Sequence, residues 1–359
     1  MSPALETRML RALAPLAGLG AAWIAFDLLV WSYGQAPGAL LGILFEGTWG
    51  TAYGAAQVLY KATPLLFTGI AVELGLRGGL FNIGAEGQLA VAGLAAGALG
   101  ARLPASVSPL FAVPLLIAAA ALAGALWAAP PAFLRARLGI HEVISTIMAN
   151  RIADAAVAFA LVSGLGVHGT VRTGDLPAGA RIPRFDAFVP AFRGSAANGS
   201  VFLAVALAVA LPWGFVRLRA LREVGLIGLN PVACAAEKIP VARRLAQTML
   251  LSGAVAGLVT TATVLGYKGH FESGLGGGVG FGGITVAVLA RGNAIGLIAA
   301  ALLLGTLEQG GLAMNAQVPM EAMQVLEGVI IVAVAVADAR VRAVLAGVLP
   351  AASKKGAVA

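Results

Sequence analysis

The chain has 359 residues, of which 59% are apolar and only 11% are charged, and its mean hydropathy is +0.91. Soluble domains carry roughly 25% charged residues, so this composition excludes an ordinary soluble protein and predicts a polytopic membrane protein. The net charge of +8 does not indicate a nucleic-acid partner, because the basic residues cluster at the ends of apolar segments. The single cysteine, Cys234, excludes an internal disulfide, and with only three histidines we expect no metal site.

Apolar segments recur along the whole chain and predict an all-α fold of about eight to ten transmembrane helices, ten being the preferred number. An even number places both termini on one side, and the basic loops make that side cytoplasmic. We expect one transmembrane domain over residues 1–359, an extracytoplasmic loop over 165–198 and a cytoplasmic loop over 223–245. The predicted spans are residues 12–32, 62–77, 80–101, 109–130, 142–163, 199–216, 246–266, 275–290, 293–311 and 322–338.

Polar and charged side chains interrupt several of these spans. Residues 81–88, FNIGAEGQ, place Asn82, Glu86 and Gln88 at the start of the third span, just after Arg77. Ionisable groups at membrane depth are costly and are usually paired or functional. The spacing of Glu73 with Arg77 and of Arg151 with Asp154 allows each pair to meet on one helix face.

Glu308, in the ninth span, has no evident local partner, and we expect it to face a polar interior. For FNIGAEGQ we favour a structural turn in which Glu86 pairs with Arg77. Lining of a polar interior is the alternative.

A different kind of segment lies between Arg222 and Arg244, GLIGLNPVACAAEKIPVARR. Asn230 is a good N-cap and Pro231 suits the first helical position, which predicts a short helix over 231–238, ended by Ile239 and Pro240. This helix is too short to span a membrane. It is either a docking helix on the cytoplasmic side or a simple connector.

Motifs of catalysis are missing from the sequence. GVGFGG (278–283) matches the dinucleotide fingerprint formally, but no strand precedes it, and we interpret it as a turn or broken helix at membrane depth. No lysine follows a glycine, so the chain has no phosphate-binding loop and should not hydrolyse ATP by itself. HExxH and GxSxG motifs are also absent, which makes a membrane enzyme improbable, and we expect no catalytic residues.

Four segments together resemble the permease family of bacterial ABC importers for nucleosides, simple sugars and branched-chain amino acids. The resemblance covers about residues 60–335 and is strongest to the longer permease subunit of the nucleoside branch. The segments occur in the family's order: GLRGGLFNIGAEGQLAVAGLAAG (75–97), GIHEVISTIMANRIA (139–153), GLNPVACAAEKIPVARR (228–244) and GFGGITVAVLARGNAIG (280–296).

The resemblance implies a permease subunit in the bacterial cytoplasmic membrane, without a cofactor of its own. Its implied partners are cytoplasmic ATPase subunits that bind the ATP, a second permease subunit and an extracytoplasmic solute-binding protein. The short helix would be the coupling helix that docks to the ATPase, although Ala236, Glu237 and Lys238 stand where the family commonly has an aromatic residue before a small residue and glycine. The implied coupling residues are Gly228, Asn230, Pro231, Ala233, Ala236, Glu237 and Lys238.

Two other functions stay open. A permease of the same family could carry ribose or another simple sugar. In a different class, an ion-coupled secondary transporter would use Glu86, Asp154 or Glu308 directly. Within the importer, Asn82, Glu86 and Gln88 would either contact the substrate or hold the turn between the second and third spans.

Overall fold

The computed structural model describes residues 20, 23–319, 321–322, 324–325, 328–329 and 332. It divides into two compact units, Thr48–Gln309 and the pair of segments Met1–Gly47 and Gly310–Ala359. The regular elements of the described residues are helices, accompanied by three isolated β-bridges, which confirms the predicted all-α class. All candidate site residues lie in the larger unit.

The smaller unit contains a helix Trp23–Ser32 and α2 (Pro37–Gly47), bent by 110° at the break between them. The predicted first span, 12–32, is therefore described only from its middle onward. Most of the predicted tenth span, 322–338, lies outside the described residues.

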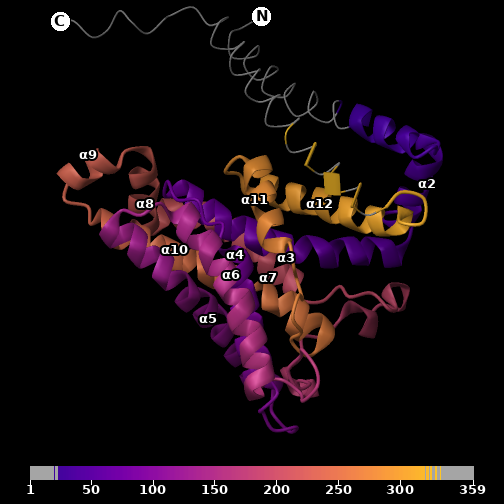
Figure 1. The fold of residues 1–359 in the computed structure, drawn as a ribbon, viewed down its shortest axis with the longest axis horizontal. Helices are drawn as coiled ribbons and strands as arrows, with labels where there is room; N and C mark the ends of the chain where they lie inside the picture. Colours follow the sequence, from indigo (N-terminus) through magenta and orange to yellow (C-terminus); the bar gives the residue numbers. More distant parts are fainter. Residues whose placement is uncertain are drawn as a thin grey trace, which may run out of the picture. The chain divides into compact units, whose positions relative to one another are not determined.

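The larger unit is built from helices joined mostly by short turns, with one long loop between η1 and α7 (Figure 1). Its elements in chain order are α3 (Ala52–Arg77), α4 (Ala85–Gly100), α5 (Pro109–Leu138), α6 (Glu142–Ala160) with a π-helical extension η1 (Leu161–Leu165), the short 3₁₀ turns η2 (Ala178–Ala180), η3 (Phe185–Ala187) and η4 (Pro190–Phe192), α7 (Ser200–Arg217), α8 (Arg219–Leu229), α9 (Pro231–Ala236), α10 (Val241–Gly257), the π-helical η5 (Thr261–Lys268), α11 (Val279–Ala290) and α12 (Ala294–Met314).

Six helices of the described residues are long and apolar enough to cross a membrane, or seven if the bent pair counts as one span. The chain is thus a polytopic membrane protein, but the number of ten spans is not confirmed. Two predicted spans are shorter than expected, because α4 has 16 residues and α11 has 12. Residues 81–84 form a turn in place of the first helical residues of α4.

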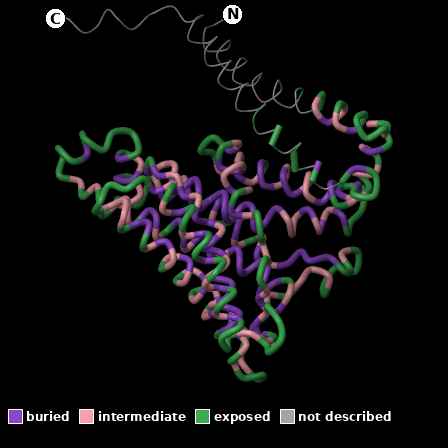
Figure 2. Tube along the Cα trace, viewed as in Figure 1, coloured by how far each residue is buried: buried purple, intermediate pink, exposed green. Residues whose placement is uncertain are grey.

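The most deeply buried spans are α3 and the continuous segment α10–η5. In their apolar windows 72% and 83% of residues are buried, against 22% to 28% in α5, α6 with η1, and α7. Figure 2 shows the same division between a buried interior and exposed outer helices. Close packing depends on small residues: a Cβ at Gly124 of α5 would meet the backbone of Gly253 and Gly257 on α10.

Charged residues and polar loops gather at the two ends of these helices. At one end, the predicted extracytoplasmic loop packs on η5 and on the residues that follow it. Ile182 N–H donates to Leu265 O of η5 at 2.9 Å, and Thr173 N–H donates to Phe271 O at 2.8 Å. At the other end lie the arginines that the topology assigns to the cytoplasm, such as Arg77, whose Nη2 donates to Gly292 O at 2.5 Å. The side of the membrane on which each end lies stays a prediction.

Candidate functional site

The turn formed by FNIGAEGQ is a buried polar corner between α3 and α4. Asn82 is fully buried and Gln88 is 1% exposed. Asn82 Nδ2 donates to Gln88 Oε1 at 3.0 Å and to Ser252 Oγ on α10 at 2.8 Å, while Asn82 Oδ1 accepts from Gly84 N–H at 2.9 Å. Ser252 in turn donates to Ala71 O of α3 at 2.6 Å. The hydrogen bonds of the two amides therefore connect α3, α4 and α10.

A third amide, Asn150 of α6, connects the same corner to α6. Its Oδ1 accepts from Gly87 N–H and its Nδ2 donates to Ile83 O, both at 2.9 Å. Asn150 and Ser252 were not predicted to belong to this corner, because they are ordinary polar residues inside apolar spans. Their position inside predicted spans was the signal that could have found them, because an amide buried in a membrane helix needs partners.

Glu86 lies in the first turn of α4, and its carboxylate reaches the start of α11. Oε1 accepts from Gly278 N–H at 2.7 Å and Oε2 from Gly280 N–H at 2.8 Å. The first N–H groups of a helix have no intrahelical acceptor and carry partial positive charge, so a carboxylate is well placed there. Gly274, Gly276 and Gly278 have φ of 84°, 83° and 87°, which explains the glycine-rich turns before α11.

The expected pair of Glu86 with Arg77 is wrong. Arg77 Nε donates to Glu73 Oε1 at 2.7 Å, one helical turn away on α3, as the four-residue spacing predicted. Its second bond goes to Gly292 O, at the end of the turn between α11 and α12. The interpretation of 278–283 as a broken helix is partly correct, since the turns end at Gly278 and the next residues open α11.

Beside Glu86 is a small polar cavity of about 200 Å³ between α4, α6 and the glycine-rich turns. Glu86, Asp154 and Ser273 give it polar walls, and Leu89, Phe271 and Val157 are among its apolar lining. Asp154 also meets Arg151, with Nη1 and Oδ2 3.6 Å apart, which confirms the predicted pair. The Arg151 and Asp154 side chains are 80% and 59% exposed, so this ion pair stands on the outer face of α6.

Glu308 has a partner after all. Lys61 Nζ of α3 lies 3.7 Å from Glu308 Oε2 on α12, and both side chains are about one quarter exposed (23% and 27%). The pair joins residues far apart in the sequence, which is why no local spacing revealed it. Glu308 thus contacts α3 through Lys61, a residue that takes no part in the hydrogen bonds of Asn82 and Gln88.

The predicted short helix is present as α9. Asn230 caps it as expected, with Oδ1 accepting from Val232 N–H and Ala233 N–H, both at 3.1 Å, and Pro231 opens it. The helix ends at Ala236, two residues before the predicted end, because Lys238 adopts a left-handed φ of 59°. Its outer surface is exposed at Val232 (78%), as is Leu229 (83%) at the end of α8, and Figure 2 shows the exposed turns around α9.

A glycine joins α9 to the polar corner. Gly228, two residues before the cap, packs on the chain between α3 and the corner, where a Cβ would collide with Arg77 O and lie 3.2 Å from Gly79 N. Val224 of α8 lies against Gly78 in the same way. The backbone that carries α9 therefore rests directly on the backbone that begins FNIGAEGQ.

Glu223 is a structural residue that the sequence analysis missed. Its carboxylate accepts from Arg219 Nε at 2.7 Å and from Arg244 Nε at 2.6 Å, so it clamps α8 to α10 on both sides of α9. Hydrogen bonds from Arg219 and Arg244 lower the pKa of the Glu223 carboxyl, which keeps the clamp charged at neutral pH. The sequence signal for this role was a single acidic residue, Glu223, directly after the arginines of 217–222.

Comparison with known proteins gives a consistent result. The guanosine ABC transporter permease protein NupP of Bacillus subtilis is 35% identical over 344 residues, covering 91% of this chain and 94% of that protein. The glucose ABC transporter permease protein TsgB13 of Haloferax volcanii is 32% identical, covering 90% and 85%. The nucleoside ABC transporter permease protein NupB of Lactococcus lactis is 30% identical, covering 91% of each chain.

No solved structure matches this chain significantly. A family profile described as the permease component of the branched-chain amino acid transport system matches residues 54–335. This range includes the polar corner, α9 and the turns before α11. The chain therefore belongs to this family of ABC transporter permeases, whose members include nucleoside and sugar permeases.

Proposed function

We propose that this chain is the permease subunit of an ATP-driven ABC importer for nucleosides in the bacterial cytoplasmic membrane. The observation that supports the coupling mechanism is the contact of Gly228 with the backbone of Arg77 and Gly79. An ATPase bound to the exposed surface of α9 would move α8 when its own conformation changes. The contact at Gly228 would then transmit this movement to the polar corner. ATP is bound by the partner, and this chain needs no cofactor.

The polar corner is the next step of the coupling. Asn82, Gln88 and Ser252 connect α3, α4 and α10, and Asn150 connects the corner to α6. Because these helices share one network of buried hydrogen bonds, a shift at Gly228 moves them together. In this proposal Asn82 and Gln88 hold the helices and do not contact the substrate.

The outer face of α6 is proposed as a wall of the translocation pathway. Arg151 is nine residues into α6, about 14 Å along a helix that must cross about 30 Å of hydrocarbon. An exposed ion pair at that depth would be expensive against lipid, so it favours a face covered by the second permease subunit or by water. The cavity beside Glu86 adjoins this face, and Asp154 and Ser273 in its lining offer acceptors for nucleoside hydroxyls.

The substrate class is proposed from the relatives, two of which are named for guanosine or nucleoside transport. The glucose permease of Haloferax volcanii, at 32% identity, favours a simple sugar as the second candidate. An ion-coupled mechanism receives less support, because Glu308 is engaged by Lys61 and both oxygens of Glu86 accept backbone N–H groups.

Reconstitution tests the proposal. The chain is placed in liposomes with its ATPase, its second permease subunit and its solute-binding protein, and uptake of labelled guanosine, ribose and glucose is measured. We expect guanosine uptake that requires ATP on the side of the membrane where the ATPase is bound. A protonophore should not reduce this uptake. Uptake by this chain alone, abolished by the protonophore, would overturn the proposal, and uptake of sugar without nucleoside would replace the substrate.

A further inference from the structure

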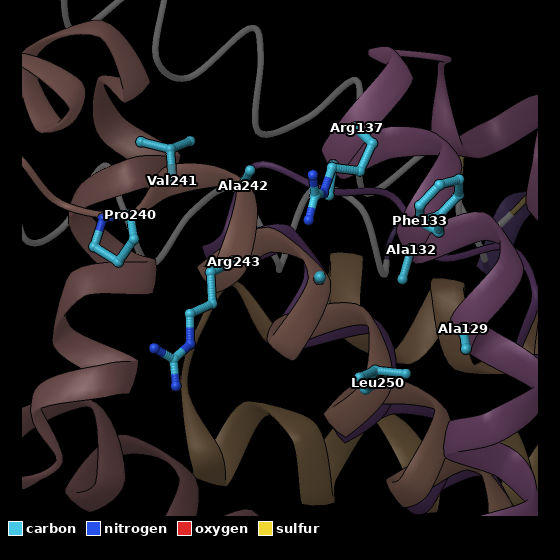
Figure 3. A pocket seen from close by; sticks show the side chains of 11 residues that line it. Ala129, Ala132, Phe133, Arg137, Pro240, Val241, Ala242, Arg243 and Leu250 are labelled. Carbon is cyan, nitrogen blue, oxygen red and sulfur yellow. The ribbon is translucent and has the colours of Figure 1, made fainter.

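A groove of about 670 Å³ opens between the end of α5 and the beginning of α10 (Figure 3). Its lining is almost entirely apolar and includes Ala129, Ala132 and Phe133 on α5 with Ala242, Ala246 and Leu250 on α10. Phe133 is 58% exposed although it belongs to a spanning helix. The groove is separate from the polar corner and from the cavity beside Glu86, with which it shares no lining residue.

Two arginines stand in this apolar lining, Arg137 on α5 and Arg243 on α10, as Figure 3 shows. Their sequence neighbours are neutralised, since Arg135 pairs with Glu142 at 3.2 Å and Arg244 with Glu223 at 2.6 Å. Among the described residues, no carboxylate lies within ion-pair distance of Arg137 or Arg243. The groove therefore carries two uncompensated positive charges.

The positions of the lining residues along the helices give the groove a direction. Ala129 lies eight residues before Arg137 on α5, about 12 Å deeper, and Leu250 lies seven residues after Arg243 on α10, about 10 Å deeper. Both helices are long and apolar enough to cross the membrane. The arginines thus stand at the level of the lipid headgroups and the apolar walls at the level of the acyl chains, which a soluble partner cannot reach.

We propose that this groove binds an anionic glycerophospholipid, with its phosphate between Arg137 and Arg243 and one acyl chain along the apolar walls. Arginine recognises phosphate oxygens with two or more donors, and basic pockets between membrane helices suit anionic headgroups. Pro240 lines the groove and belongs to the short connection between α9 and α10. A bound lipid would therefore stabilise the position of this connection.

Lipid retention by the purified full-length chain tests the site. The protein is equilibrated with equal amounts of phosphatidylglycerol and phosphatidylcholine of identical acyl chains, and the lipids bound to it are counted by native mass spectrometry. We expect a preference for phosphatidylglycerol that falls about tenfold in the double variant Arg137→Gln/Arg243→Gln. The matched control is Arg217→Gln/Arg222→Gln, which removes two exposed arginines outside the groove and should leave the preference unchanged.

Two further measurements separate the headgroup from the acyl chain and from a protein occupant. Ala136→Phe fills the groove while both arginines remain, and it should reduce the retention of both lipids. Undiminished preference in the arginine double variant, an equal loss in the control, or full retention in Ala136→Phe would each overturn the proposal. So would loss of the bound lipid when the chain assembles with its ATPase and second permease subunit, because a protein would then cover the groove.

Discussion

Glu86 is the single residue whose surroundings best explain the family signature around it. Its carboxylate gives both oxygens to backbone N–H groups at the start of α11, and these belong to residues 192 and 194 positions further along the chain. The glycines that it contacts leave room for this approach, since a Cβ at Gly280 would collide with the backbone and side chain of Glu86. Glu86 therefore fixes α11, a helix of only 12 residues, to α4.

The substitution Glu86→Gln should weaken the whole protein before it alters transport. An amide can accept from one of the two N–H groups, while its own NH₂ faces the other and leaves it unpaired. The loss is expected to be about 1–3 kcal/mol, visible as a lower midpoint of thermal unfolding in detergent and as less assembled transporter. Glu321→Gln, which changes an exposed carboxylate outside the polar corner and outside the implied coupling residues, is the stability control. Normal stability and assembly with reduced transport would instead make Glu86 a substrate contact.

At this scale, sequence reasoning succeeded where both partners were close in the chain. The Asn230 cap and the pairs Glu73–Arg77 and Arg151–Asp154 follow from helical spacing alone. The partners of Glu86 and Glu308 were not predictable in this way, because Gly278 and Lys61 come from distant helices. Arg77 looked available to Glu86 only because the nearer Glu73 was not counted as its exclusive carboxylate partner.

At the scale of elements, Gly228 is the point at which α8, just before α9, meets the backbone between α3 and the polar corner. Glu223 holds α8 to α10, and the missing side chain at Gly228 lets α8 end directly on the backbone of Arg77. A side chain at this position must push the two backbones apart, because neither is a flexible group that can swing away. The distance between α9 and the polar corner is thus set by one glycine.

Gly228→Ala should therefore reduce the coupling between ATP hydrolysis and uptake. We expect ATPase activity in the assembled transporter to be less stimulated by the loaded solute-binding protein, with uptake reduced severalfold. Gly225→Ala is the matched control on the same helix, because its Cβ would meet only the Phe215 ring at an ordinary 3.6 Å. Equal effects of the two alanines would show that helix propensity, and not the contact with Arg77, controls the coupling.

Local sequence signals predicted some helix boundaries and missed others. Capping chemistry predicted where α9 begins, whereas its end depended on the left-handed backbone of Lys238. The short helices α4 and α11 were overextended, because hydropathy does not register the turn at 81–84 or the glycine turns before Gly278. The helix α8 was not expected at all, since its polar face and basic residues resemble a loop in a hydropathy reading.

At the scale of the whole molecule, the distribution of buried and exposed helices indicates which faces need a partner. The faces of α5, α6 and α7 are similarly exposed, yet within them only α6 carries an exposed ion pair near its middle. Lipid suffices to cover α7, whose exposed side chains Phe202, Val209 and Trp213 are apolar. The α6 face is the one whose chemistry calls for protein or water.

A photo-crosslinking amino acid distinguishes these two faces in the assembled transporter. Phe159 lies eight residues after Arg151 on α6, about 80° around the helix axis from it, and is 74% exposed, and Phe202 on α7 is 70% exposed. Replacing Phe159 with p-benzoylphenylalanine should give a crosslink to the second permease subunit on irradiation. The same replacement at Phe202 should give lipid adducts only, because that face is proposed to meet the bilayer. Crosslinking from Phe202 but not from Phe159 would move the permease interface to α7 and would leave the Arg151–Asp154 pair without the covering partner that its exposure requires.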